Sequence, residues 1–259
     1  MGGAMTRSPV VPFCFIVFLI SPIYCFAQSK SPAAALAGPD PSSAVVSVHE
    51  LQIPEKARSA CNKGTERFAA KDSEGSIPEF QKAIKAFPDY YEAYAKLGAA
   101  ELDLERWDDA EAAFRKSIEL SGGHYAPANF GLALILATVT KQFAEAETVV
   151  RAGLEMKPAD ETGHFVLAWV LYSTSRLQEA EKSAREAVLT EPNFAGARLL
   201  LAQIHLRENN PSAVVEDLDA YLALGVTGPS DEKVRAVRAE AQRALPKPEA
   251  NSEIVESSY

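Results

Sequence analysis

Apolar residues recur along this chain at three- and four-residue spacing, which is typical of helices that bury one face. Between about residues 57 and 226 the apolar stretches are each about 12 to 14 residues long, or roughly 20 Å as a helix. Short polar turns separate them, for example at residues 71–74 and 105–108. The pattern predicts an all-α body built from helices that follow one another in pairs.

The helix pairs repeat with a nearly fixed period. Each copy begins with a small residue, and a large apolar residue follows four positions later. A second small residue comes three positions after that, and a helix stop follows five positions further on. The first small or branched residue of the successive copies is Ser76, Ala110, Ala146, Ala180 and Val214. The step between copies is therefore 34, 36, 34 and 34 residues. One pair alone cannot bury its apolar face, so the copies are expected to stack on one another.

These residues resemble the tetratricopeptide repeat family, whose pattern runs Trp-x2-Leu-Gly-x2-Tyr and then Ala-x3-Phe-x2-Ala-x4-Pro over 34 residues. The best single copy carries Tyr94, Leu97, Gly98, Ala110 and Phe114. The resemblance covers residues 57–226 and implies a right-handed α-solenoid of about five helix-turn-helix units. We expect the units at residues 57–90, 91–124, 127–160, 161–194 and 195–226.

The segment after the last repeat is predicted to close the stack. Ser230 followed by Asp231 and Glu232 favours a helix start by capping and by the helix dipole. Apolar residues at helical spacing follow, so residues 230–245 are predicted to form a C-terminal capping helix. Residues 246–259 are acidic and poor in apolar residues, and we expect them to be a disordered tail.

The N-terminal segment resembles a secretory signal. Arg7 precedes an uncharged apolar stretch at residues 10–27 that ends in Ala27, which predicts a signal peptide at residues 1–27. Retention of residues 10–27 as an inner-membrane anchor is the alternative. Residues 28–56 are predicted to be a flexible linker with a short extended segment near Val46 and Val48. Together with the family resemblance, this predicts an exported bacterial-type protein that is periplasmic or extracellular.

Composition and charge narrow the classes of partner. The chain has 259 residues, with 26 Lys and Arg against 35 Asp and Glu, giving a formal net charge of -9. That balance argues against binding nucleic acid or an acidic membrane surface. Removal of the signal would leave Cys61 as the single cysteine, so no internal disulfide is expected, and we interpret this residue as a half-buried structural side chain.

The sequence contains no catalytic signature. Phosphate-binding loops, dinucleotide motifs, nucleophile elbows and zinc-protease motifs are all missing from it. The four histidines are His49, His124, His164 and His205, and no two of them have the i, i+4 spacing of a metal pair on a helix. We therefore predict that the chain is not an enzyme and holds no metal and no cofactor.

The resemblance instead implies a concave groove lined by the first helix of each repeat. Phe165, Trp169 and Tyr172 are spaced i, i+4, i+7, which places three aromatic side chains on one helix face. They are candidate anchors for a partner, although the same stripe could pack within the core. The other groove positions singled out are Phe68, Leu102, Ile135, Leu199 and Leu206.

The predicted function is that of a protein-interaction scaffold or adaptor in the cell envelope. An apolar or amphipathic segment of a partner protein would bind in the groove. Self-association into a homo-oligomer, occupation of the groove by the chain's own residues 45–53, and a role as a non-catalytic subunit of an enzyme complex are the alternatives.

Overall fold

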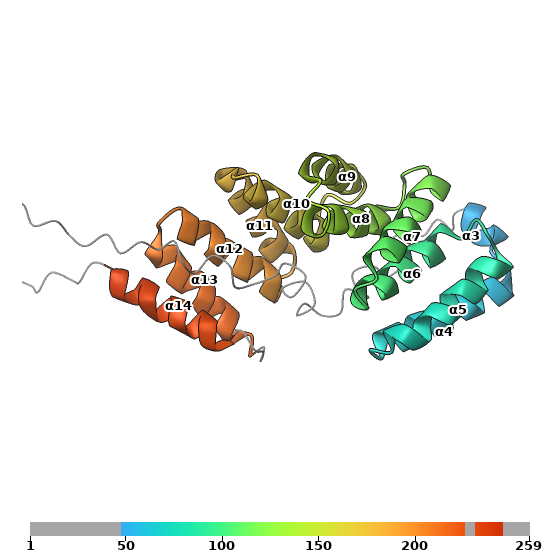
Figure 1. Cartoon of the computed structure of the whole chain (residues 1–259), viewed down its shortest axis with the longest axis horizontal. Helices are drawn as coiled ribbons and strands as arrows, with labels where there is room; N and C mark the ends of the chain where they lie inside the picture. The colour runs from blue at the N-terminus through green and yellow to red at the C-terminus, as the bar shows by residue number, and fades with distance from the viewer. Residues whose placement is uncertain (1–47, 226–230, 246–259) are drawn as a thin grey trace, which may run out of the picture.

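The computed structural model describes residues 48–225 and 231–245, and within them every regular element is an α-helix. Figure 1 shows these helices following one another along the long axis of an arched stack. The predicted all-α solenoid is therefore confirmed. The expected signal at 1–27, most of the linker and the tail at 246–259 lie outside the described residues.

Each repeat contributes two antiparallel helices of nearly equal length. The first helices of the five repeats are α4 (Glu55–Ala69), α6 (Tyr91–Asp103), α8 (Ala126–Thr138), α10 (Glu161–Ser173) and α12 (Ala195–Arg207). The second helices are α5 (Ser73–Ala86), α7 (Trp107–Leu120), α9 (Phe143–Met156), α11 (Leu177–Thr190) and α13 (Pro211–Ala223). From α4 to α13, each helix packs against the next one along the chain, as a solenoid requires.

The turn between the two helices of each repeat has the same backbone conformation. One residue of each turn has a positive φ between 56° and 65°, although none of these residues is glycine. They are Lys71, Glu105, Lys141, Ser175 and Asn209. Their spacing follows the period of the apolar pattern, including the single longer step. The left-handed residue therefore reverses the chain once per repeat, two positions before the second helix begins.

The repeated small and apolar positions form the core. Ser76, Ala110, Ala146 and Ala180 are fully buried, and the large rings of Phe80 and Phe114 at the next matched position are fully buried as well. Small residues allow two helices to approach closely, and a large residue from the second helix fills the space that remains. This is why the sequence period could be recognised from side-chain size alone.

The start of the described chain differs from the prediction. Val48–Gln52 forms a short helix, α3, and not an extended segment, so the extended conformation expected near Val48 is wrong. His49 of this helix stacks on Tyr91 with ring centroids 4.4 Å apart, and its Nε2 lies 3.4 Å from a carboxylate oxygen of Glu92. This contact with the first turn of α6 overrides the local preference of a β-branched residue for an extended backbone.

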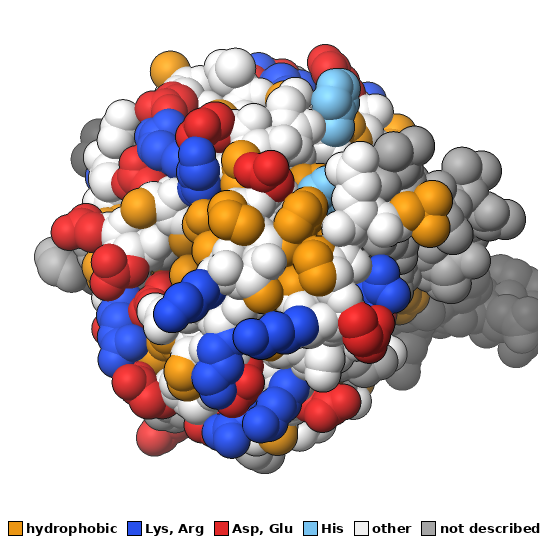
Figure 2. Space-filling model, turned by 90° about the vertical axis from the view of Figure 1, so that its right-hand side faces the viewer, with side chains coloured by type: hydrophobic (Ala, Val, Ile, Leu, Met, Phe, Trp, Pro, Cys, Tyr) orange, Lys and Arg blue, Asp and Glu red, His pale blue; other side chains and the backbone are white. Residues whose placement is uncertain are grey.

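The two ends of the stack are closed differently. At the C-terminal end, α14 (Asp231–Ala244) covers the last repeat, with Val234 and Ala241 buried. Arg238 of this helix forms a bidentate ion pair with Asp219, with hydrogen bonds of 2.7 and 2.9 Å. The N-terminal end is shown in Figure 2, where hydrophobic side chains gather in the middle of the face and Lys and Arg lie beside them. Leu51 of α3 is 72% exposed. None of the helices described is long and apolar enough to cross a membrane.

Candidate functional site

The three aromatic residues of α10, Phe165, Trp169 and Tyr172, differ in their burial. Phe165 is only 1% exposed, and its ring lies 5.1 Å from that of Phe194 at the start of the next repeat. The geometry is that of two aromatic side chains packed between repeats. Phe165 therefore has almost no surface to offer to a partner in this conformation.

Tyr172 is also buried, at the other end of the trio. The guanidinium of Arg207, in α12, lies 4.8 Å from the Tyr172 ring centroid and donates a 3.0 Å hydrogen bond to the Tyr172 carbonyl oxygen. Burial raises the pKa of the Tyr172 hydroxyl, so this ring remains neutral at physiological pH. The contact between Arg207 and Tyr172 joins the fourth repeat to the fifth.

Trp169 lies between these two residues along the helix and is only partly buried. Its ring centroid is 5.7 Å from that of Tyr172. The indole nitrogen Nε1 is itself inaccessible to solvent, and it has no hydrogen-bond acceptor within the structure described. A buried N–H without an acceptor is uncommon in native proteins and needs an explanation.

Of the other predicted groove residues, only Leu206 keeps partial exposure. The remaining four are buried, namely Phe68, Leu102, Ile135 and Leu199. Ile135 lies in α8, which is buried at every residue from Ala126 to Ala137. The exposed part of the predicted site thus consists of Trp169 and Leu206, with Tyr172 and Arg207 beside them.

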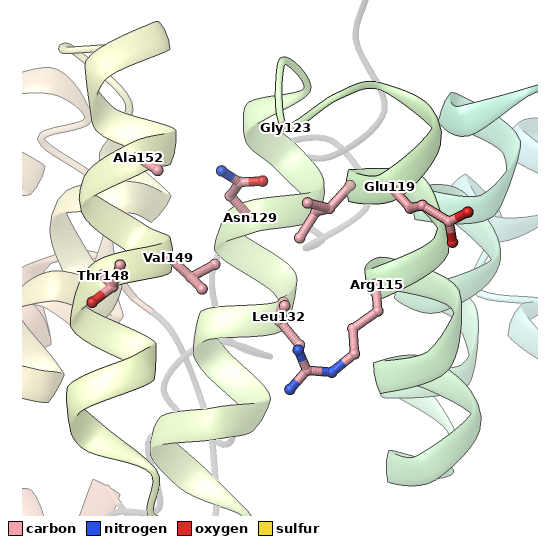
Figure 3. A pocket seen from close by; sticks show the side chains of 9 residues that line it. Arg115, Glu119, Gly123, Asn129, Leu132, Thr148, Val149 and Ala152 are labelled. Carbon is pink, nitrogen blue, oxygen red and sulfur yellow. The ribbon is translucent and has the colours of Figure 1, made fainter.

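A cavity of about 420 Å³ lies elsewhere in the stack, between α7, α8 and α9. It was not predicted from the sequence. Figure 3 shows Asn129 projecting from α8 toward α9, with Leu132 below it and Arg115 and Glu119 contributed by α7. The lining residues are Arg115, Ile118, Glu119, Gly123, Asn129, Leu132, Thr148, Val149 and Ala152. One signal for it was available, because Asn129 is the single polar side chain in the run from Ala126 to Ala137.

A second polar cluster joins the fourth and fifth repeats. His205 of α12 is buried, with Nδ1 2.7 Å from Asp217 Oδ2 and Nε2 3.1 Å from Glu181 Oε1. The hydrogen bond with Asp217, and then that with Glu181, raises the pKa of His205. The imidazolium form therefore links the helices α11, α12 and α13 by charge-assisted hydrogen bonds.

The same cluster is the place where the described residues could bring ligands to a metal ion. Possible ligand atoms of Glu181, His205 and Glu208 lie within 4.8 Å of one another. However, Glu181 Oε1 already accepts hydrogen bonds from His205 and from Arg185 Nε at 3.0 Å. An ion would have to displace Arg185 from this oxygen, so the arrangement is better suited to an ion-pair network.

Cys61 is fully buried, and not half-buried as the sequence suggested. Burial raises the pKa of its thiol. The thiolate is the reactive form of cysteine, so this residue acts as a small core side chain.

Comparison with known proteins places this geometry in a family. Among solved structures, a thermophilic TPR protein of Thermus thermophilus (TTC0263) is 18% identical with a TM-score of 0.59, covering 72% of this chain and 99% of that chain. PilW, a type IV pilus biogenesis factor, is 15% identical with a TM-score of 0.64, covering 73% and 90%. YrrB, a TPR protein with an unusual peptide-binding site, is 17% identical with a TM-score of 0.52, covering 72% and 92%.

At these identities the structural neighbours establish the fold alone. No curated protein sequence matches the chain. The family model for the tetratricopeptide repeat matches residues 61–125, 131–195 and 165–232, which together make up more than half of the chain. The five helix pairs, their shared turn and these matches show that the chain belongs to the tetratricopeptide repeat family.

Proposed function

We propose that this chain is a non-catalytic protein-interaction scaffold that binds an apolar or amphipathic segment of a partner protein on the face carrying Trp169 and Leu206. The observation that carries the proposal is the buried indole N–H of Trp169, which has no acceptor in the structure described. A main-chain carbonyl of a bound segment would supply one once the side chains that cover Nε1 move aside. Stacked helix pairs commonly present such surfaces to partner segments.

The side chains around Trp169 suit an apolar partner segment. The partly exposed Leu206 provides apolar surface on the next first helix, α12, and the buried Tyr172 packs beside the Trp169 ring. Leu206 matches Tyr172 after one 34-residue step, so both side chains occupy the same position in consecutive repeats. Arg207 is held by the Tyr172 carbonyl and by Ser175 Oγ at 3.1 Å. Its charge is therefore fixed at the edge of the surface.

Affinity capture from the native envelope fraction tests this function. Trp169→Ala removes both the ring and the donor, and should weaken binding of a captured partner by about 5- to 150-fold, as expected for an interface anchor. Trp169→Phe keeps an aromatic ring and removes the donor, and should weaken binding by about 2- to 12-fold. Trp107→Phe, at the start of α7, is the matched control and should leave binding unchanged.

The binding segment of any captured partner should then be mapped with overlapping peptides. An apolar or amphipathic segment whose binding depends on Trp169 would support the proposal. A partner that binds the wild type and Trp169→Ala equally well would contradict it. The helical circular dichroism of each variant must first match that of the wild type, so that loss of fold is not mistaken for loss of binding.

The proposed location is the periplasm or the exterior, after removal of residues 1–27. N-terminal sequencing of the protein isolated from its native host should give Gln28 as the first residue. Recovery of the intact N-terminus in the membrane fraction would instead favour the anchored alternative, in which residues 10–27 are retained.

Self-association is the second candidate, and it is favoured by the N-terminal end of the stack. Leu51 of α3, at this end of the chain, is 72% exposed. Figure 2 shows hydrophobic side chains gathered in the middle of this end face. Light scattering at increasing concentration should show a growing mass if this face joins two copies. Leu51→Glu should then return the protein to a monomer, whereas a constant mass for the wild type would exclude this candidate.

A further inference from the structure

The cavity between α7, α8 and α9 contains one buried polar group whose bonding is incomplete. Asn129 is 3% exposed, and its side-chain oxygen Oδ1 is covered by the protein and receives no hydrogen bond in the structure described. Asn129 lies in α8 beside the fully apolar Leu132, and both line the cavity. An amide oxygen buried without a donor is unfavourable, so a ligand that brings a donor to this point is favoured.

The charged groups around the cavity are already matched to one another. Arg115 binds Glu111 Oε1 through Nε at 2.8 Å and Glu145 Oε1 through Nη2 at 2.9 Å. Glu119 accepts a 2.8 Å hydrogen bond from Lys116. The rim therefore offers no unpaired charge, and this selects an uncharged ligand over an ion.

The remaining lining is mostly apolar. Ile118 and Val149 are partly buried and face the cavity from α7 and α9. The hydroxyl of Thr148 donates to the carbonyl of Ala144 at 3.0 Å, so it is not free to donate to a ligand. The cavity thus calls for an apolar group with one hydrogen-bond donor and no charge.

Among protein side chains, the indole of tryptophan fits this description. Its Nε1–H is a donor only, whereas a tyrosine hydroxyl also brings an acceptor that would need a donor of its own. A volume of about 420 Å³ is within the range of cavities that hold small ligands. We propose that this cavity is a second binding site, which receives a tryptophan side chain of a partner protein. The Asn129 amide turns its Oδ1 into the cavity, and the indole N–H donates to that oxygen.

This site does not depend on the function proposed above. It is built from α7, α8 and α9, whereas Trp169, Tyr172, Leu206 and Arg207 come from α10 and α12. The two sites can therefore fail separately. Trp169→Ala should leave binding at the cavity unchanged.

The test uses the purified chain and three probes: indole, 1-methylindole and benzofuran. The last two lack its N–H: 1-methylindole carries a methyl group on the nitrogen, and benzofuran has an oxygen in place of the nitrogen. Selective ¹⁵N labelling of asparagine allows the side-chain amide of Asn129 to be followed by NMR during each titration. We expect indole to shift this amide signal and to bind about 2- to 12-fold more tightly than either analogue, the range expected for one neutral hydrogen bond.

Two variants make the test specific. Asn129→Leu has a similar shape and removes the acceptor, so indole and 1-methylindole should bind it equally well. Val149→Trp places a large side chain in the cavity wall and should abolish binding of all three probes. N-acetyltryptophanamide, which presents the side chain as a protein does, should reproduce the behaviour of indole in the wild type and in both variants.

Three outcomes would overturn the proposal. The first is equal affinity of the wild type for indole and 1-methylindole. The second is an indole preference that persists in Asn129→Leu. The third is probe binding that shifts signals outside the cavity but not those of Asn129.

Discussion

Phe114 allows the close packing of this solenoid to be tested at a single pair of residues. Its ring is fully buried, and it is contacted by two glycines: Gly98 of its own repeat and Gly131 of the next. A Cβ added at Gly131 would lie 2.3 Å from Phe114 Cζ and 2.5 Å from Cε1. A Cβ added at Gly98 would lie 3.1 Å from the nearest ring atoms. Gly131→Ala is therefore the informative perturbation, and Gly98→Ala is its control.

The magnitude follows from two opposing effects. Overfilling a well-packed core is destabilising by about 1 to 3 kcal/mol. Replacing a helical glycine by alanine is stabilising by about 0.5 to 1 kcal/mol, because alanine loses less backbone entropy on folding. At Gly131 the contact of 2.3 Å cannot be accommodated without moving a buried ring, so the net loss should be about 1 to 2 kcal/mol. At Gly98 a shift of a few tenths of an ångström suffices, and the two effects should nearly cancel.

Urea unfolding followed by circular dichroism at 222 nm measures these differences. Gly131→Ala should lower the free energy of unfolding by the stated amount and the melting temperature by about 2 to 8 °C, as expected for a domain of this size. Phe114→Leu should be destabilising in the wild-type background and much less so beside Gly131→Ala, because a smaller side chain makes room for the new methyl group. The double-mutant cycle should give a coupling energy of about 0.5 to 3 kcal/mol.

Two results would refute this reasoning. If Gly131→Ala is as stable as Gly98→Ala, the repeats are not packed as closely as the distances indicate. If the effects of Gly131→Ala and Phe114→Leu simply add, the destabilisation arises somewhere other than at the Phe114 ring.

Two further predictions concern the turns and the inter-repeat ion pairs. Glu105 has a φ of 57°, so Glu105→Gly should relieve about 1 to 2 kcal/mol of left-handed strain against about 0.4 to 1 kcal/mol of extra unfolded-state entropy. Urea unfolding should then show a small net gain. The hydrogen bond with Asp217 is the largest cause of the raised pKa of His205. Protonated His205 therefore stabilises the fold fully below the pKa that it has in the unfolded state, and this contribution is lost as the pH rises through its folded-state pKa. Unfolding free energies from pH 5 to 9 should fall with pH in the wild type, and less steeply in His205→Gln.

The fold could be predicted because the repeat period is expressed in side-chain size. Ser76, Ala110 and their counterparts are small because two helix backbones meet there, and they are buried in the structure for the same reason. The left-handed turn residues keep the same period but could not be recognised. Lys141 and Ser175 are not residue types that indicate a positive φ, and the repeat geometry imposes this conformation on them.

The groove could be predicted only in part. Helical spacing correctly places Phe165 and Trp169 on one face, but burial depends on what the next repeat brings to that face. Phe194, 29 residues further along the chain, packs on Phe165, whereas Trp169 stays partly exposed. The cluster around His205 was missed for a similar reason, because Asp217 and Glu181 approach it from two other helices.

Two buried polar atoms without a hydrogen-bond partner allow effects on binding to be distinguished from effects on stability. The carbonyl acceptor proposed for Trp169 and the indole donor proposed for Asn129 are both absent from the chain's own packing. Trp169→Phe and Asn129→Leu remove the unmatched atom while keeping most of the volume, so each should leave the free energy of unfolding unchanged or raise it. If these residues are only structural, there is no binding for the variants to lose. If they serve partners, each variant should become at least as stable as the wild type while losing affinity, which is the trade expected where function is maintained at the expense of stability. A loss of stability in Asn129→Leu would show that the native fold already satisfies that oxygen, and the binding site in the cavity would have to be abandoned.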